Sequence, residues 1–254
     1  MPARGVVVPV SPLPYRSPLR TRRGEGKCEN VQEYQASFIE FMVRSGVLMF
    51  GDFTTKSGRR TPYFINTGRY TSGDQMARLG EYYARAIVEQ VDAPVDFLFG
   101  PAYKGIPLAV TTAIALSTHH NRSVGVCFNR KEAKDHGEGG VLIGHPPRDG
   151  ERVVIVEDVT TAGTSIRETL ALLGPIAAVH YAAVVVSVDR MERGSSSRSA
   201  LDEIRSALGI AVYPLVTLND IVTHLHRRTI DGEVVLTDEV KARIDSYRQR
   251  YGAP

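Results

Sequence analysis

The sequence has little of what membrane, secreted and metal-cluster proteins carry. No apolar stretch is long enough to span a membrane, because Gly174, Pro175 and His180 interrupt the longest candidate, residues 171–188. The apolar run near the N-terminus, residues 5–10, is too short for a secretory signal peptide. The two cysteines lie far apart and lack metal-ligand spacing. We therefore expect reduced thiols and a cytoplasmic location.

The chain also lacks a large net charge of either sign. The formal net charge is +3 and the isoelectric point is near 8.9, which is too weakly basic to indicate a nucleic-acid partner. Hydrophobic residues make up 43% of the chain and charged residues 23%, as in ordinary globular proteins. A length of 254 residues suits one large α/β domain or two small ones.

Residues 1–28 differ from the rest of the chain. They hold five prolines and five arginines, and Glu25 is their one acid. This composition predicts an extension that adds little to the core. A transit peptide is the alternative, since such peptides are rich in arginine and poor in acids, but the prolines disfavour the amphipathic helix it needs.

The central stretch of the chain is residues 153–165. Four β-branched residues, 153–156, predict a strand buried on both faces of a parallel sheet. Glu157 and Asp158 follow at its carboxyl end, where open α/β sheets bind ligands. Small residues then open a predicted helix over 166–173. Free N–H groups at a helix N-terminus bind phosphate, so this stretch predicts a phosphate cradle beside two carboxylates.

A second strand–turn–helix unit precedes it. A short strand over 95–99 leads into a glycine-containing turn, residues 100–105, and a helix over 106–117. The glycines allow a close backbone approach, and Lys104 at the mouth of the helix suits an anion. An ordinary βα turn is the alternative interpretation.

Residues 129–140 form an almost wholly polar segment after a predicted strand, 123–128. The segment carries three glycines, a histidine and several cations. It is either a solvated flexible hairpin or a lid that closes over an anionic ligand. A long strand over 177–188 ends in Asp189 and Arg190, which again follow the carboxyl end of a strand.

The remaining pattern completes an α/β fold. We predict further helices over 30–45, with Asn30 as N-cap, and over 74–90, 201–208, 218–226 and 238–251, and further strands over 47–55, 61–67 and 210–215. Strands and helices alternate from 95 to 215, which predicts a mostly parallel sheet flanked by helices. Residues 29–254 then form one domain, with a core over about 71–216. A small cap comes from about 29–70 and the C-terminal helix.

At this point several motifs resemble a known family. Residues 153–165 resemble the phosphoribosyl-pyrophosphate (PRPP) signature of type I phosphoribosyltransferases. Residues 56–64, 99–107, 129–140 and 189–190 resemble the orotate phosphoribosyltransferase family in particular, in the family's order. The polar segment is the most specific match. Glu157 is a departure, because an Asp-Asp pair is common there.

The resemblance implies a reaction of orotate with PRPP that gives orotidine 5′-monophosphate and pyrophosphate, with Mg²⁺, in pyrimidine biosynthesis. It implies a type I phosphoribosyltransferase fold with a hood, and a homodimer whose segment 130–140 reaches the neighbour's site. Mg²⁺ would be held mainly by PRPP and water, near Glu157 and Asp158, without direct protein ligands.

The resemblance also assigns residues. PRPP contacts fall on Tyr103, Lys104, Arg130, Lys131, Lys134, His136, Glu157, Asp158, Thr160, Thr161, Ala162, Gly163, Thr164 and Ser165. Orotate contacts fall on Lys56, Phe64, Ile65, Thr161 and Arg190, and catalytic roles on Arg130, Lys131, Lys134, His136 and Asp158. Core packing is the alternative for Phe64 and Tyr103, and orientation of Arg190 is the alternative for Asp189.

Two rival functions stay open on the sequence. A phosphoribosyltransferase for another base, such as a purine, would share the PRPP signature, but Lys56 and Arg190 favour a substrate with a carboxylate. A PRPP-sensing nucleic-acid regulator is disfavoured by the intact polar segment and the weak basic charge.

Overall fold

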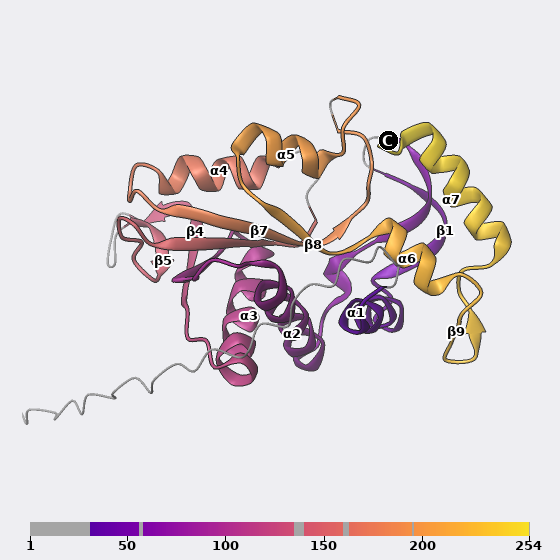
Figure 1. Ribbon diagram of the computed structural model, residues 1–254, viewed down its shortest axis with the longest axis horizontal. Helices are drawn as coiled ribbons and strands as arrows, with labels where there is room; N and C mark the ends of the chain where they lie inside the picture. Colours follow the sequence, from indigo (N-terminus) through magenta and orange to yellow (C-terminus); the bar gives the residue numbers. More distant parts are fainter. Residues whose placement is uncertain (1–30, 56–57, 135–139, 160–162, 195, 254) are drawn as a thin grey trace, which may run out of the picture. The chain divides into compact units, whose positions relative to one another are not determined.

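A six-stranded sheet lies at the centre of the molecule (Figure 1). The structure is a computed structural model that describes residues 31–55, 58–134, 140–159, 163–194 and 196–253, with 132–134 described by their backbone alone. The strand order is β5-β4-β3-β6-β7-β8, and all neighbours are parallel except β4 and β5. The strands are β3 (Phe97–Gly100), β4 (Gly125–Lys134), β5 (Gly140–Gly144), β6 (Arg152–Glu157), β7 (His180–Asp189) and β8 (Val212–Thr217).

Helices cover both faces of this sheet. Figure 1 shows α4 (Thr164–Leu173) and α5 (Ala200–Leu208) on one face, with α2 (Gly73–Gln90) and α3 (Gly105–His120) on the other. Successive residues of a strand point to opposite faces. Val153 and Ile155 therefore join the core beneath α4 and α5, whereas Val154 and Val156 join the other core. The predicted α/β fold with a mostly parallel, doubly covered sheet is confirmed.

The strand order creates a switch point between β3 and β6. These two strands are neighbours, although β4 and β5 lie between them in the sequence. The chain leaves β3 through a tight turn, because a Cβ on Gly100 would lie 2.1 Å from the Gly105 carbonyl oxygen. Ligands of open α/β sheets bind where the strand order reverses, so the carboxyl ends of β3 and β6 mark the candidate site.

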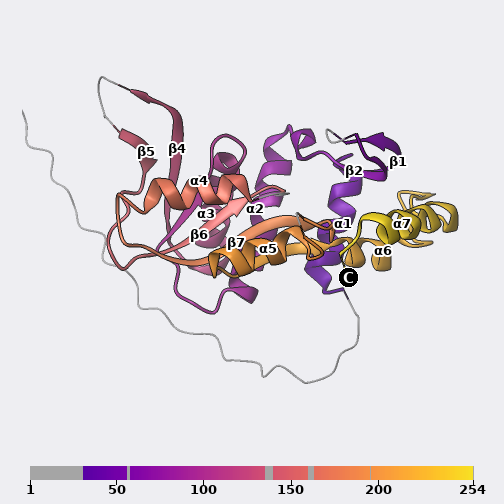
Figure 2. The ribbon, with the colours of Figure 1, turned by 90° about the horizontal axis from the view of Figure 1, so that it is seen from above.

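A hood lies beyond the β8 side of the sheet. It contains α1 (Glu33–Arg44), the antiparallel pair β1 (Leu48–Thr54) and β2 (Arg60–Ile65), α6 (Leu218–Leu225) and α7 (Asp238–Tyr251). Figures 1 and 2 show these elements together. The rings of Tyr63 on β2 and Tyr247 on α7 meet edge to face at 6.0 Å. Short elements complete it: η1 (Thr67–Arg69), β9 (Thr229–Ile230) and β10 (Glu233–Val234).

Three local predictions differ from the structure. Helix α1 begins at Glu33 with Gln32 as N-cap, and the predicted cap Asn30 lies outside the described residues. The strand predicted to end at 128 continues to Lys134, because β5 pairs with it and supplies backbone partners to the polar segment. The hairpin β9–β10 and strand β5 were not predicted.

None of the helices that the structure describes has the length and apolar character that crossing a membrane requires.

Candidate active site at the carboxyl edge of the sheet

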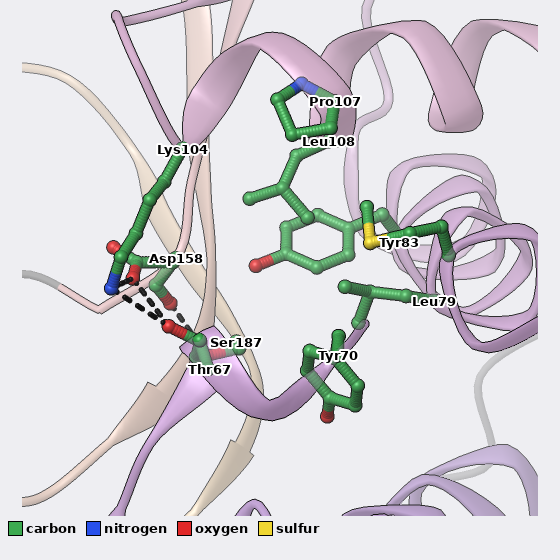
Figure 3. A pocket seen from close by; sticks show the side chains of 11 residues that line it. Thr67, Tyr70, Leu79, Tyr83, Lys104, Pro107, Leu108, Asp158 and Ser187 are labelled. Carbon is green, nitrogen blue, oxygen red and sulfur yellow. Dashed lines mark hydrogen bonds and ion pairs between the residues drawn. The ribbon is translucent and has the colours of Figure 1, made fainter. Parts of the chain in front are cut away.

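An ion pair joins the two turns at the switch point (Figure 3). Lys104 Nζ lies 2.9 Å from Asp158 Oδ2, and the Thr67 hydroxyl donates to the same oxygen at 2.7 Å. Lys104 Nζ also donates to Thr67 Oγ1 at 3.0 Å. The lysine side chain is 62% exposed and the aspartate 14%, so the carboxylate is fixed and the ammonium faces solvent. Lys104 and Asp158, both named as site residues from the sequence, therefore lie in direct contact.

The two neighbouring acids have opposite pKa shifts. Burial alone would raise the pKa of Asp158, but hydrogen bonds from Lys104 and Thr67 outweigh it and lower the pKa. Burial raises the pKa of Glu157 to about 7, although the Ser165 hydroxyl and the Asp158 N–H both donate to its carboxylate. Near neutral pH the site therefore holds one firmly ionised acid and one that takes up a proton easily.

Buried donors hold the backbone of the two acids. The hydroxyl of Tyr83, on α2, donates to the Glu157 carbonyl at 2.7 Å. Ser187, on β7, donates to the Asp158 carbonyl through its N–H at 2.9 Å and its hydroxyl at 2.5 Å. These contacts tie the end of β6 to α2 and β7, so neither acid is free to shift with its turn.

A side chain from β4 supports the Lys104 turn. The Asn129 side-chain oxygen accepts a hydrogen bond from the Ala102 N–H at 2.8 Å. Thr67, Tyr83, Asn129 and Ser187 were not predicted to act at the site. A buried tyrosine hydroxyl needs a partner, which was the one signal available for Tyr83. Thr67 carried no signal, because its partners come from other parts of the chain.

The N-terminus of α4 is the described part of the predicted phosphate cradle. Gly163 precedes the helix with φ of +67°, and a Cβ there would lie 2.7 Å from Ile204 Cγ1. Only glycine fits both conditions without strain. Thr164 and Ser165 begin the helix. The predicted contacts Thr160, Thr161 and Ala162 lie outside the described residues.

A small cavity extends from the ion pair between α2 and α3. Its volume is about 160 Å³, below the usual range of ligand pockets. Figure 3 shows Lys104, Asp158 and Thr67 on one side and apolar side chains on the other. The lining residues are Thr67, Gly68, Tyr70, Met76, Leu79, Tyr83, Lys104, Pro107, Leu108, Asp158 and Ser187. The cavity is therefore too small for a whole nucleotide.

The polar segment reaches the same turn through β4. Lys131 Nζ lies 4.9 Å from the centre of the Tyr103 ring, and Tyr103 is 66% exposed. Arg130 lies on the same strand. Lys134 pairs with Gly140 through its backbone, but its side chain, like the whole of His136, lies outside what the structure describes.

The predicted orotate contacts that the structure describes, Phe64, Ile65 and Arg190, lie in and beside the hood. Phe64 is half-buried and stacks on Phe53 with ring centres 5.5 Å apart. Arg190 follows β7 and pairs with Glu192 rather than with Asp189. The Asp189 carboxylate instead accepts the Met191 N–H at 2.8 Å. Two further predicted orotate contacts are Ile65 and Lys56. Ile65 is half-buried, and Lys56 lies outside the described residues.

Comparisons with known proteins agree with this geometry. Residues 66–212 match the family described as the phosphoribosyl transferase domain. The orotate phosphoribosyltransferase of Lachnoclostridium phytofermentans is 53% identical over 222 residues, covering 87% of this chain and 99% of the relative. That of Clostridium beijerinckii is 53% identical over 223 residues, covering 88% of this chain and 100% of the relative.

A solved structure supports the same conclusion. The crystal structure of the Francisella tularensis orotate phosphoribosyltransferase superposes with a TM-score of 0.74 at 36% identity, covering 85% of this chain and 99% of that one. The chain thus matches these relatives along nearly their whole length. The chain belongs to the orotate phosphoribosyltransferase family.

Proposed function

We propose that the protein transfers the phosphoribosyl group of PRPP to orotate, in the pyrimidine biosynthesis of its cell. A bond forms between the orotate ring nitrogen and C1 of the ribose, and the bond from C1 to pyrophosphate breaks. The observation that carries the proposal is the gathering of Lys104, Asp158 and Arg190 at the carboxyl ends of three neighbouring strands, β3, β6 and β7.

The α4 end of the site suits the ribose phosphate. Free N–H groups and the positive end of a helix dipole favour a phosphate there, so residues 160–165 take the 5′-phosphate. Glu157 and Asp158 bind the ribose hydroxyls. The raised pKa of Glu157 reduces the negative charge that meets a highly anionic substrate.

The Lys104 end suits the leaving pyrophosphate. Lys104 exchanges its contact with Asp158 for a pyrophosphate oxygen, which its exposure permits. Further cations come from the polar segment of a neighbouring subunit: Arg130, Lys131, Lys134 and His136. These preorganised charges stabilise the negative charge that develops as the bond to C1 breaks.

Orotate lies between β7 and the hood. Arg190 binds its carboxylate, Phe64 and Ile65 contact the ring, and Lys56 and Thr161 contribute polar contacts. Arginine suits a planar carboxylate because its guanidinium donates two parallel hydrogen bonds.

Magnesium fits this site as a cation carried by the substrate. Among the described residues no three acids, histidines or cysteines gather as a metal site. The two adjacent acids, Glu157 and Asp158, suit contacts to the water shell that Mg²⁺ retains. When bound, the ion neutralises pyrophosphate charge. We further propose that the protein works in the cytoplasm and that 29–254 form one catalytic domain after an extension, 1–28.

The direct test follows orotate absorbance with purified protein and PRPP, with and without Mg²⁺. We expect orotate consumption that needs both PRPP and Mg²⁺. A panel of purine bases serves as the comparison. Consumption of a purine with no consumption of orotate would contradict the proposal.

Replacement of Lys134 tests the polar segment. We expect Lys134→Ala to lower turnover about 10²–10³-fold with an unchanged melting temperature, because one preorganised cation is lost. Lys241→Ala is the control, since Lys241 pairs with Asp245 on α7, away from the proposed segment. Equal turnover of Lys134→Ala and wild type would remove the segment from the mechanism.

A further inference from the structure

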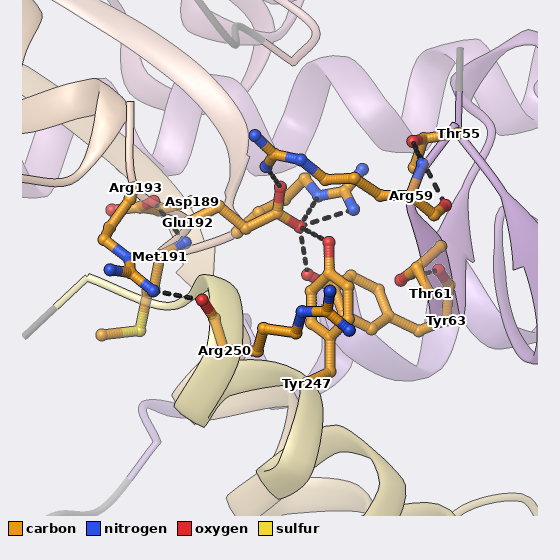
Figure 4. Close-up of polar contacts among 11 residues, drawn as sticks. Thr55, Arg59, Thr61, Tyr63, Asp189, Met191, Glu192, Arg193, Tyr247 and Arg250 are labelled. Atoms are coloured by element: carbon orange, nitrogen blue, oxygen red, sulfur yellow. Dashed lines mark hydrogen bonds and ion pairs between the residues drawn. The ribbon is translucent and has the colours of Figure 1, made fainter. Parts of the chain in front are cut away.

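Glu192 joins three elements that are distant in sequence (Figure 4). Its Oε1 accepts hydrogen bonds from the Tyr63 hydroxyl of β2 at 3.1 Å and the Tyr247 hydroxyl of α7 at 2.9 Å. The same oxygen accepts from Arg190 Nε at 2.9 Å. The Glu192 side chain is 18% exposed. No motif considered above includes this residue, yet it lies where the hood, the C-terminal helix and the end of β7 meet.

The backbone around Glu192 is fixed to the C-terminus of α7. The Arg193 N–H donates to the Tyr251 carbonyl at 2.9 Å, and the Ala253 N–H donates to the Met191 carbonyl at 2.8 Å. Glu192 itself bridges to Gly252. Burial, and then the Glu192 carboxylate, raise the pKa of Tyr247, so its hydroxyl stays protonated and keeps donating. The carboxylate therefore has a defined position before any ligand arrives.

Glu192 contacts one edge of the Arg190 guanidinium. A guanidinium presents two edges that each match a carboxylate, one made by Nε and Nη2 and one by Nη1 and Nη2. Glu192 Oε1 accepts a hydrogen bond from Nε and lies 2.6 Å from Nη2, which is buried and makes no hydrogen bond of its own among the described residues, so the carboxylate covers the first edge. The plane of the group is set by the Tyr63 ring, whose centre lies 5.0 Å from the Arg190 Cζ. The contact with Glu192 leaves Nη1 as the nitrogen that suits a second carboxylate.

Among the residues that the structure describes, two cations face the Glu192 carboxylate. Arg59 Nη1 lies 3.9 Å from Glu192 Oε2, so two arginines share this carboxylate. A ligand carboxylate on Arg190 would balance the charge of the group. A ligand without a carboxylate would leave the Arg190 edge, with its side chain 15% exposed, without a charged partner.

We propose that Glu192 is a positioning residue that orients Arg190 for the carboxylate of the pyrimidine. In this arrangement Tyr247 of α7 holds the Glu192 carboxylate in place through its hydroxyl. The inference rests on the proposed function, since it assigns the orotate carboxylate to Arg190. It adds that recognition of the base depends on the C-terminal helix, whose Tyr247 donates a hydrogen bond to Glu192.

The test is the Glu192→Gln variant, which keeps the side-chain size and removes the charge. We expect the KM for orotate to rise about 10–100-fold, as for a lost charge-assisted hydrogen bond, with kcat and the KM for PRPP changed less than about threefold. Glu233→Gln is the matched control, because Glu233 is exposed in the β10 strand of the small hairpin. An unchanged orotate KM, or equal rises of both KM values, would overturn the inference.

A second variant decides the question if Glu192→Gln does not fold. Tyr247→Phe removes one donor to Glu192 and keeps the ring, and we expect an orotate KM raised about threefold to tenfold. In an Arg190→Lys background, Tyr247→Phe should add little, because lysine has no second edge to orient. If Tyr247→Phe raised the orotate KM by the same factor in the Arg190→Lys background as in the wild type, the inference would be overturned. Absence of orotate consumption by the wild type would instead contradict the proposed function.

Discussion

The two ion pairs of the site differ in how their cation is placed. Lys104 and Asp158 lie 2.9 Å apart, with the lysine 62% exposed, whereas Arg190 and Glu192 lie 2.6 Å apart, with both side chains below 20% exposed. An exposed lysine is a point charge on a flexible stem and can change partners. A buried arginine keeps one partner and offers a second edge. The first pair therefore suits a leaving group that comes and goes, and the second suits recognition of a rigid base.

Removal of Arg190 should have the largest effect. We expect Arg190→Ala to lower kcat/KM for orotate about 10²–10³-fold, since a bidentate charged contact is lost. It should also lower the free energy of unfolding by about 2–4 kcal/mol, because Glu192 stays largely buried and keeps only the more distant Arg59 as a charged partner. Steady-state kinetics and urea unfolding measure the two effects. If Arg190→Ala were as stable as the wild type, burial of the Arg190–Glu192 pair would not stabilise the fold.

Lys104→Ala should separate activity from stability. We expect kcat/KM for PRPP to fall about 10–100-fold, because one charge near the pyrophosphate disappears. The free energy of unfolding should change by less than about 1 kcal/mol, since the ammonium is exposed and its pairing is screened by solvent. A loss of stability as large as that of Arg190→Ala would remove the contrast between the two pairs.

The pH dependence of stability should report on Glu157. Its folded-state pKa is raised from 4.5 to about 7, so its contribution to stability is complete below 4.5 and is lost as pH rises through 7. Relative to Glu157→Gln, the wild type should lose on the order of 1–3 kcal/mol between pH 5 and about 8. The lowered pKa of Asp158 acts at lower pH and does not interfere. If the free energy of unfolding changed with pH in the same way in wild type and Glu157→Gln, the raised pKa of Glu157 would be contradicted.

The smallest effect is expected for Thr67→Val. The change keeps the shape and removes the hydroxyl that contacts both Lys104 and Asp158. We expect the KM for PRPP to rise about threefold, since one hydrogen bond is worth roughly 1 kcal/mol, while the KM for orotate stays constant. Thr71→Val is a control outside the ion pair. A larger change in the orotate KM than in the PRPP KM would argue against separate contributions of the Lys104–Asp158 pair to PRPP binding and of the Arg190–Glu192 pair to orotate binding.

Much of the fold followed from local pattern, and the exceptions share a cause. The terminal helix α7 runs over the predicted residues, Asp238–Tyr251, because its caps and its run of helix formers are local. Strand β5 was missed because its Gly140–Gly144 segment becomes a strand only by pairing with β4. The polar half of β4 was predicted as a loop for the same reason. β-propensity depends on the neighbour that a strand meets.

The candidate site divides in the same way. Glu157, Asp158 and Lys104 were predictable, because carboxyl ends of neighbouring parallel strands meet at one edge whatever the loops do. Thr67 was not, since both of its partners lie more than thirty residues away along the chain. Glu192 was not either, because the tyrosines that hold it beside Arg190 come from distant elements.

The sequence by itself determined the class of sheet, the strand–turn–helix order around Glu157 and Asp158, and the family of the chain. These depend on periodicity and on short motifs, which are properties of adjacent residues. Only the tertiary structure decided which cation pairs with which acid, how the two pKa values separate and that α7 supports Arg190. Burial and distance set those energies, and both arise from contacts between distant segments such as Tyr63, Glu192 and Tyr247.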